Sequence, residues 1–336
     1  AMTYLQLSRR TYAFLTTLST TSCYRWRSPA LVEAFVHHSP GRPGSNSRLF
    51  SSFQAPEPPS SKGLAIFSDV DIAPNQPITA DAQQRNSDPD AVFVVNGSSR
   101  GIGLQMVQSL LERTRGTIVA CCRDPSVLDA SLFHNERIDT FDLDLTDQST
   151  IDALEDHLKT DHNNRVDGLF NVAGILGDGD TTPGPERSLA RLEREWLEHT
   201  LQVNVVGHVM LIQALQRMLK SNTKRPTSVV VNLSARVGSI SDNELGGWYS
   251  YRLSKAALNQ ATRTMAHELK RQGTYAIAVH PGTTDTDLSK PFQRNVKKEK
   301  LFPVDFTVNQ ILDVVDHLEQ DHSGGLYDWA GKAIPF

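Results

Sequence analysis

The chain has 336 residues, and its 34 basic and 38 acidic side chains give a net charge of −4. Length alone suggests about two domains. Three cysteines are too few for a disulfide framework, and no apolar run reaches the roughly 18 residues that cross a bilayer. A net negative chain has no general affinity for nucleic acid.

Residues 1–50 have the composition of an organelle transit peptide. Residues 1–56 hold six arginines, one acidic residue and 15 serines and threonines. Such a segment forms a basic amphipathic face because no acids neutralise it, and Arg48-Leu-Phe-Ser51 resembles the cleavage pattern of mitochondrial presequences. We expect a mitochondrial address. The alternatives are a plastid address, or a cytoplasmic protein if the segment is only a disordered extension.

Residues 51–90 are predicted to form a Pro-rich linker or arm. Six prolines in this stretch interrupt any helix or central strand. The apolar residues 64–67 could add a short edge strand or an arm across the core, and a disordered linker is the alternative.

From residue 91, short apolar runs alternate with helical patterns. We expect strands in the ranges 91–95, 117–120, 137–143, 166–172, 228–233 and 275–279. Helical patterns run through 104–111, 151–158, 189–219, 249–269 and 304–318. Alternation of this kind predicts a parallel sheet with helices on both faces, whose buried strands are continuously apolar. Residues 91–336 are therefore predicted to be one α/β catalytic domain with a Rossmann-type doubly wound sheet in three layers.

A glycine-rich loop, Asn96-Gly-Ser-Ser-Arg-Gly-Ile-Gly103, joins the first expected strand to its helix. Glycines let the backbone turn tightly and approach a pyrophosphate, and the helix N-terminus offers free N–H groups. A plain turn is the alternative for a lone glycine cluster, but the position between strand and helix favours a nucleotide site.

The order of several motifs resembles the short-chain dehydrogenase/reductase family. The glycine loop has the family's spacing, with Asn96 where threonine is usual. The further motifs are Asn171-Val-Ala-Gly174, Asn204-Val-Val-Gly207, Tyr251-Arg-Leu-Ser-Lys255 and Pro281-Gly282. The segments 246–251 and 323–331 also resemble the carbonyl-reductase-like branch that includes C-factor and sniffer. The resemblance covers about 91–336.

The choice of cofactor follows from charge at the end of the second strand. An acid there binds the ribose hydroxyl of NAD, whereas an arginine suits the 2′-phosphate of NADP. Arg123 takes that position, and Arg100 can approach the same phosphate; for Arg123 alone, a solvated loop charge is the alternative. We therefore expect NADP(H).

The resemblance implies further contacts to the cofactor. Asp144 would bond the adenine amino group, unless it is only a turn acid, and Leu145 would cover the ring. The residues expected to hold the cofactor are Gly97, Ser99, Arg100, Gly101, Ile102, Gly103, Arg123, Asp144, Leu145, Asn171, Ala173, Gly174, Tyr251, Lys255, Pro281, Gly282 and Thr284.

Tyr251 and Lys255 are the expected acid/base pair. Four residues apart, they lie on one face of a helix. A free tyrosine has a pKa near 10, and a nearby ammonium would lower it. By resemblance, Lys255 also bonds the nicotinamide ribose, and Asn204 holds a water that links Lys255 to solvent; a helix-bending or capping asparagine is the alternative. The histidines show no metal-binding motif, so no metal is expected.

One position departs from the family. The segment Asn232-Leu-Ser-Ala-Arg-Val-Gly238 places Ala235 where the family's catalytic serine is usual. That serine donates a hydrogen bond to the substrate carbonyl. Ser234 or Ser239 could replace it, or no serine has this role; Ser234 is the candidate we carry forward.

These features predict an NADPH-dependent oxidoreductase that reduces a small-molecule ketone or aldehyde, or runs the reverse reaction, with the loop 283–303 covering the substrate. The missing serine motivates an alternative, a signalling module that binds NADP(H) with weak or no turnover. A third reading is a structural subunit of an organellar complex. Family resemblance implies a homodimer or homotetramer formed through the helices that carry Asn204 and Tyr251.

Overall fold

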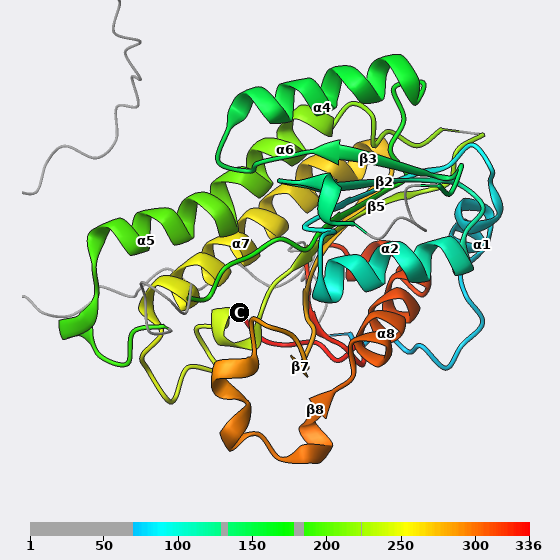
Figure 1. The fold of residues 1–336 in the computed structure, drawn as a ribbon. Coiled ribbons are helices and arrows are strands. Elements are labelled where there is room, and N and C mark those ends of the chain that lie inside the picture. Colours follow the sequence, from blue (N-terminus) through cyan, green and yellow to red (C-terminus); the bar gives the residue numbers. More distant parts are fainter. Residues whose placement is uncertain (1–69, 129–133, 178–184, 223) are drawn as a thin grey trace, which may run out of the picture. The chain divides into compact units, whose positions relative to one another are not determined.

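A seven-stranded parallel sheet forms the centre of the protein in this computed structural model (Figure 1). The structure describes residues 70–128, 134–177, 185–222 and 224–336. The strands are β1 (Val92–Asn96), β2 (Thr117–Cys122), β3 (Ile138–Asp142), β4 (Gly168–Asn171), β5 (Ser228–Leu233), β6 (Thr274–His280) and β9 (Leu326–Asp328). Their order is β3-β2-β1-β4-β5-β6-β9, so the chain reverses direction across the sheet between β1 and β4. In open α/β sheets, ligands bind at the carboxyl ends of the strands beside this switch point.

Helices cover both faces of the sheet. They are α1 (Ala80–Ser87), α2 (Gly101–Arg113), α4 (Gln148–Asp161), α5 (Arg194–Leu201), α6 (Gly207–Leu215), α7 (Tyr249–Leu269) and α8 (Val304–Asp316). A π-helical segment (Gln202–Val206) joins α5 to α6. Short 3-10 turns lie at Pro125–Val127, Leu189–Arg191, Arg236–Gly238, Lys270–Gln272, Lys290–Asn295, Lys298–Lys300 and Gln320–His322.

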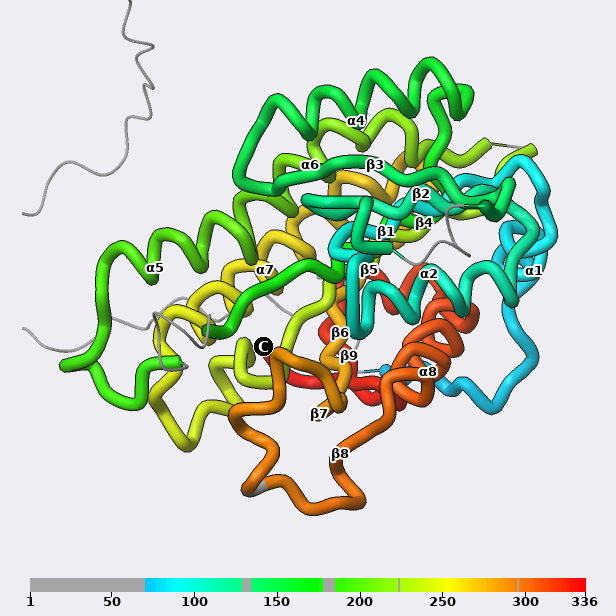
Figure 2. Tube along the Cα trace, viewed as in Figure 1, coloured from blue at the N-terminus to red at the C-terminus, as the bar shows by residue number. Residues whose placement is uncertain are grey.

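The apolar residues of each strand alternate between two cores. In β1, Phe93 and Val95 pack with residues of α2 and α8, whereas Val92 and Val94 pack with residues of α4, α6 and α7. This alternation follows from the period of two in a strand, and it places α2 and α8 on one face and the other three helices on the opposite face (Figure 2). The predicted α/β fold with a doubly wound sheet in three layers is confirmed.

Three short strands were not expected from the sequence. β9 adds to β6 at the edge of the sheet, and β7 (Thr283–Thr284) pairs with β8 (Leu301–Phe302) in a separate two-stranded unit. Each has two or three residues, too few to show a strand pattern.

Residues 70–90 pack against the sheet domain and include a helix, so the expectation that prolines exclude one from 51–90 is wrong for this part. Helix α1 lies between two prolines, and Thr79 caps it by accepting a hydrogen bond from the N–H of Ala82 at 3.2 Å. The guanidinium of Arg85 lies 3.5 Å from the carboxylate of Asp316. Ile72 is buried and donates its N–H to the carbonyl of Gly331 at 2.8 Å.

Residues 1–50, with the expected transit peptide, and the segment 64–67 lie outside the described residues. Among the residues that are described, no helix has the length and apolar character needed to cross a membrane.

Candidate cofactor and active site

A cavity of about 410 Å³ opens at the carboxyl ends of the strands, next to the switch point between β1 and β4. Most of the expected cofactor residues line it: Gly97, Ser99, Arg100, Gly101, Ile102, Gly103, Arg123, Asp144, Leu145, Ala173, Gly174, Tyr251, Lys255 and Pro281. Ser234 lines it too. One cavity therefore brings together residues separated by up to 184 positions in the chain, from Gly97 to Pro281.

The glycine loop brings backbone to the cavity where no side chain fits. Gly97 has a φ of +76°, and a Cβ there would lie 2.6 Å from the backbone nitrogen of Ala173. A Cβ on Gly103 would lie 2.1 Å from the carbonyl oxygen of Gly97. Helix α2 then begins with no acidic residue in its first turn and no side-chain cap. Its free N–H groups and positive dipole end suit an anion such as a pyrophosphate.

Asn96 and Asn171 form a ladder of side-chain amides beneath the cavity. The amide nitrogen of Asn96 donates to the side-chain oxygen of Asn171, whose own nitrogen donates to Asn232 at 2.7 Å. The side-chain oxygen of Asn96 accepts the N–H groups of Val172 and Ala173, each at 3.0 Å. Asn171 was expected at the cofactor, but it is fully buried and supports the cavity wall from below.

Two other expected contacts also lie behind the wall. A Cβ on Gly282 would lie 2.7 Å from the ring of Phe302, so this glycine accommodates an aromatic side chain. The hydroxyl of Thr284 lies 3.0 Å from the hydroxyl of Thr307 on α8. Neither Gly282 nor Thr284 lines the cavity. Gly282 packs against Phe302, and the Thr284 side chain packs against Thr307.

Sequence reasoning missed several lining residues. Thr286, Asp287 and Leu288 reach the cavity from the loop that was assigned to the substrate, and His199 and Val203 reach it from α5 and the π-helical segment. No motif marks any of these residues. They reach the cavity because the segment after β6 and the segment before α6 fold against it.

Two arginines at the cavity carry positive charge. Arg123 is exposed directly after β2, and Arg100 lies 3.6 Å from the carboxylate of Asp287. Burial raises the pKa of Asp144, but hydrogen bonds from Thr146 and the charge of Arg123 outweigh it and leave the pKa lowered. Asp144 accepts the N–H and the hydroxyl of Thr146 at 2.8 and 2.7 Å through one carboxylate oxygen.

Tyr251 and Lys255 lie on α7 beside each other, with the ammonium nitrogen 5.6 Å from the centre of the tyrosine ring. The ammonium donates to the carbonyl of Leu233 at the end of β5, at 2.8 Å. Burial raises the pKa of Tyr251 well above its usual value and lowers the pKa of Lys255 to about 8. Desolvation of the phenol thus shifts the pKa of Tyr251 upward here, opposite to the lowering expected from the ammonium of Lys255 alone.

Asn204 is buried in the π-helical segment, and its side chain is hydrogen-bonded to the backbone of Ile175 and to Ser254. The side-chain oxygen accepts the N–H of Ile175, and the nitrogen donates to the carbonyl of Ile175, both at 2.8 Å. The nitrogen also donates to the hydroxyl of Ser254 at 3.1 Å. A Cβ on Gly174 would lie 3.3 Å from the Asn204 side chain and 3.6 Å from the Lys255 ammonium, so the two groups flank one glycine. The Asn204 side chain thus supports the cavity wall beside Lys255, and the expected water relay stays a prediction.

The two candidate serines point in different directions. The hydroxyl of Ser234 donates to the side-chain oxygen of Asn259 at 2.6 Å, at the cavity wall. The hydroxyl of Ser239 donates to the carbonyl of Pro335 near the C-terminus, and Ser239 does not line the cavity. Ala235 is buried and supplies only a methyl group. Of the two, only Ser234 is placed where a substrate could meet it.

Comparisons with known proteins point to one family. The short chain dehydrogenase profile matches residues 91–297. A 1-hydroxy-2-glutathionyl-2-methyl-3-butene dehydrogenase of Rhodococcus sp. (strain AD45) is 30% identical over 202 residues, which are 60% of this chain and 81% of that protein.

Two solved structures share the fold over 74% of this chain. Carbonyl reductase Sniffer of D. melanogaster is 25% identical with a TM-score of 0.64, and all of that chain is covered. An NADPH-bound carbonyl reductase from chicken fatty liver is 28% identical with a TM-score of 0.63, and 99% of that chain is covered.

Proposed function

The chain belongs to the short-chain dehydrogenase family, and from this premise we propose that it is an NADP(H)-dependent oxidoreductase that interconverts a ketone or aldehyde and its alcohol. Tyr251 acts as the general acid/base. The observation that carries the proposal is that the tyrosine–lysine pair on α7 and the glycine loop before α2 line the same cavity.

The residues present fit a dinucleotide phosphate. Gly97 and Gly103 lie next to the N-terminus of α2, where a side chain would clash with the backbone of Ala173 or of Gly97. Arg123 and Arg100 supply the charge that a 2′-phosphate needs, and the chicken carbonyl reductase of similar fold was solved with NADPH bound. When bound, NADPH supplies the hydride that reduces the carbonyl carbon.

The chain's own residues handle the proton. The raised pKa of Tyr251 keeps its phenol protonated at neutral pH, so it can donate to the carbonyl oxygen of the substrate. The pKa of Lys255, about 8, lies near neutrality, where a group both gives and regains protons efficiently. Lys255 therefore stabilises the phenolate as it forms and returns a proton to it.

A second donor to the carbonyl oxygen comes from Ser234. The amide nitrogen of Asn259 is buried without a hydrogen-bond partner. Turning the Asn259 amide by 180° exchanges the positions of its oxygen and its nitrogen. The nitrogen then donates to the Ser234 oxygen, and the Ser234 proton becomes free for the substrate. This arrangement pairs the Asn259 nitrogen with Ser234 and replaces the hydroxyl that Ala235 lacks.

The test is NADPH consumption by the full chain against a panel of ketones and aldehydes. Tyr251→Phe should lower kcat by about 10²–10⁴-fold with NADPH affinity retained, because the ring stays while the proton donor is lost. Tyr249→Phe is the matched control, since that tyrosine has no lysine four residues later, and it should keep full activity. Equal turnover of wild type and Tyr251→Phe contradicts the mechanism.

Ala235 favours a second candidate function, an NADP(H)-binding module with weak or no turnover. Loss of one hydrogen-bond donor to the reacting oxygen costs about 10²–10³ in kcat. Under this reading, NADPH binds in a fluorescence titration, and no carbonyl in the panel is reduced by the wild-type chain. Turnover above the rate of Tyr251→Phe excludes it.

Three further proposals concern the cell. We propose that residues 1–50 carry a mitochondrial address, tested by imaging the full chain and a chain lacking those residues. We also propose a homodimer or homotetramer, tested by light scattering. A stoichiometric partner of different sequence that co-purifies would instead support a structural subunit of an organellar complex.

A further inference from the structure

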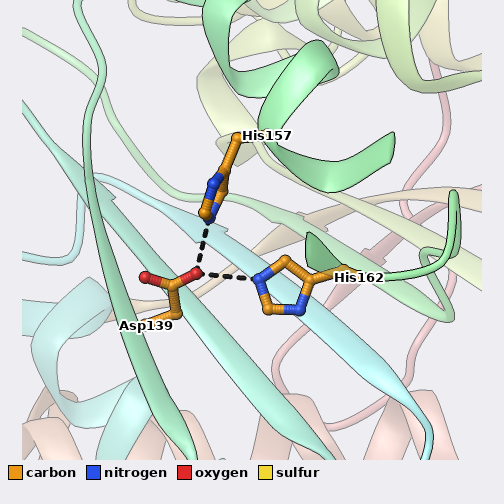
Figure 3. A group of neighbouring side chains, drawn as sticks. All are labelled: Asp139, His157 and His162. Carbon is orange, nitrogen blue, oxygen red and sulfur yellow. Dashed lines mark hydrogen bonds and ion pairs between the residues drawn. The ribbon is translucent and has the colours of Figure 1, made fainter. Parts of the chain in front are cut away.

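Two histidines and an aspartate meet at the outer edge of the sheet, in a cluster that no part of the proposed reaction uses (Figure 3). Asp139 comes from the edge strand β3, His157 from the last turns of α4, and His162 from the residue that ends this helix. One carboxylate oxygen of Asp139 lies 2.6 Å from Nε2 of His157 and 2.8 Å from Nε2 of His162. All three potential ligand atoms lie within 4.8 Å of one another.

The sequence did not reveal this group. The histidines are five residues apart, and the carboxylate comes from a strand 18 residues before the first of them, so no known metal-binding spacing appears. Packing of α4 against β3 creates the group. The prediction of no metal rested on motifs alone, and a motif search cannot detect side chains that the fold brings together from a helix end and a sheet edge.

A fourth residue orients the first histidine. Nδ1 of His157 lies 2.8 Å from a carboxylate oxygen of Asp161, one helical turn further along α4. Both ring nitrogens of His157 thus face carboxylates, and each contact needs a proton or a cation between nitrogen and oxygen. A metal on Nε2 meets this need on the Asp139 side, while Nδ1–H donates to Asp161. Histidines that bind metals commonly donate their other N–H to a carboxylate in this way.

The ring planes are also held in place by packing. The ring of Phe141, from the same strand as Asp139, stacks on His157 with centres 5.1 Å apart. The rings of His157 and His162 meet edge to face at 5.2 Å. The side chains of Asp139, His157 and His162 are 32%, 22% and 12% exposed, so the cluster is shielded but reachable by an ion.

We propose that Asp139, His157 and His162 form a binding site for Zn²⁺, with Asp161 orienting His157 and water completing the coordination. Two imidazoles and one carboxylate are ligands that zinc takes in proteins, at about 2.0–2.2 Å. The nitrogen–oxygen contacts of 2.6 and 2.8 Å need only a small opening to admit the ion.

The site lies away from the chemistry, and its role is to join the end of α4 to the edge strand. Thr146, just before α4, lines the cofactor cavity, whereas His157 and His162 stand at the other end of this helix. His157 and His162 lie nine and 14 residues after Gln148, where the helix begins. At 1.5 Å per residue, this is a separation of roughly 14–21 Å along the helix. Zinc should therefore stabilise the fold without changing catalysis.

The experiment is a Zn²⁺ titration of the chelator-treated full chain by calorimetry, with Co²⁺ absorption as a second probe. We expect one ion per chain and an apparent Tm raised by about 5–10 °C at 100-fold excess over Kd. The His162→Gln variant should weaken binding at least 100-fold, and Asp161→Asn by about 10–100-fold. His134→Gln, which changes an exposed histidine outside the cluster, should bind as the wild type does.

Circular dichroism of each variant separates loss of a ligand from loss of the fold, and Asp161→Asn changes a side chain that is 57% exposed and leaves all three ligands in place. The proposal is overturned if zinc does not bind, or if His162→Gln and His134→Gln bind it equally. Either result would make the cluster an ion-pair network between α4 and β3. Carbonyl reduction by the wild type should be the same with and without zinc, which keeps this test independent of the proposed function.

Discussion

Replacing Lys255 by methionine tests the electrostatics of the site through protein stability. Burial lowers the pKa of Lys255 from 10.5 to about 8. The unfolded chain, with its ordinary lysine, therefore binds more protons than the folded chain between pH 8 and 10.5, and the free energy of unfolding rises with pH in that window. Below pH 8 both states are protonated, and the burial penalty is present in full.

The magnitude follows from the same shift. Each pKa unit corresponds to 1.36 kcal/mol, so the 2.5-unit difference is worth about 3 kcal/mol. Lys255→Met removes the titrating group and nearly conserves volume. It also leaves the carbonyl of Leu233 without its donor, which costs about 1–3 kcal/mol at every pH. The variant should thus match or exceed the wild-type stability at pH 7 and fall behind it by pH 10.5.

Urea unfolding of both proteins from pH 7 to pH 10.5 measures this. Other groups titrate alike in the two proteins and cancel in the difference. Lys298→Met, which replaces an exposed lysine in the same way, is the matched control for the loss of one lysine charge. A difference between wild type and Lys255→Met that stays constant to within about 0.5 kcal/mol over this range would refute the reasoning, because it would mean that Lys255 titrates alike in both states.

Three further predictions concern cofactor and site. Asn96→Ala leaves the N–H groups of Val172 and Ala173 without an acceptor, so the free energy of unfolding in urea should fall by about 2–4 kcal/mol; an unchanged midpoint contradicts the support role of the ladder. Arg123→Ala should raise the Kd for NADPH about 10–100-fold in a fluorescence titration and leave the Kd for NADH unchanged. An equal rise of both Kd values would contradict a contact between Arg123 and the 2′-phosphate. Ser234→Ala should lower kcat about 10²–10³-fold, because a donor to the reacting oxygen is lost, and an unchanged kcat would mean that Ser234 does not donate to the substrate.

The arrangement of the sheet was predictable because its strands are buried on both faces. Continuous apolar runs such as Ser228–Leu233 stand out against the polar loops, and β5 has these bounds in the structure. Helix α1 was missed because its composition is polar. It is held to the domain by the ion pair of Arg85 with Asp316, which lies 231 residues later in the chain. A local pattern carries no information about such a partner.

The candidate site was predictable to the level of its cavity. Motif residues such as Gly97, Tyr251 and Lys255 line it. The direction of the tyrosine pKa was not predictable, because sequence spacing shows the neighbouring ammonium but not the burial of the phenol. The ladder role of Asn171 was likewise hidden, since it requires the registers of β1, β4 and β5 to place three asparagines side by side.

The most direct measurement for the proposed function is transfer of deuterium from NADPH that carries deuterium at both C4 positions, followed by mass spectrometry of the product. With a carbonyl compound found in the panel, the wild-type chain should place one deuterium on the carbinol carbon of the alcohol. Tyr251→Phe, with NADPH bound to saturation, should place almost none in the same time. Equal deuterium in both products, or none with the wild type across the whole panel, would contradict a carbonyl reduction in which Tyr251 supplies the proton.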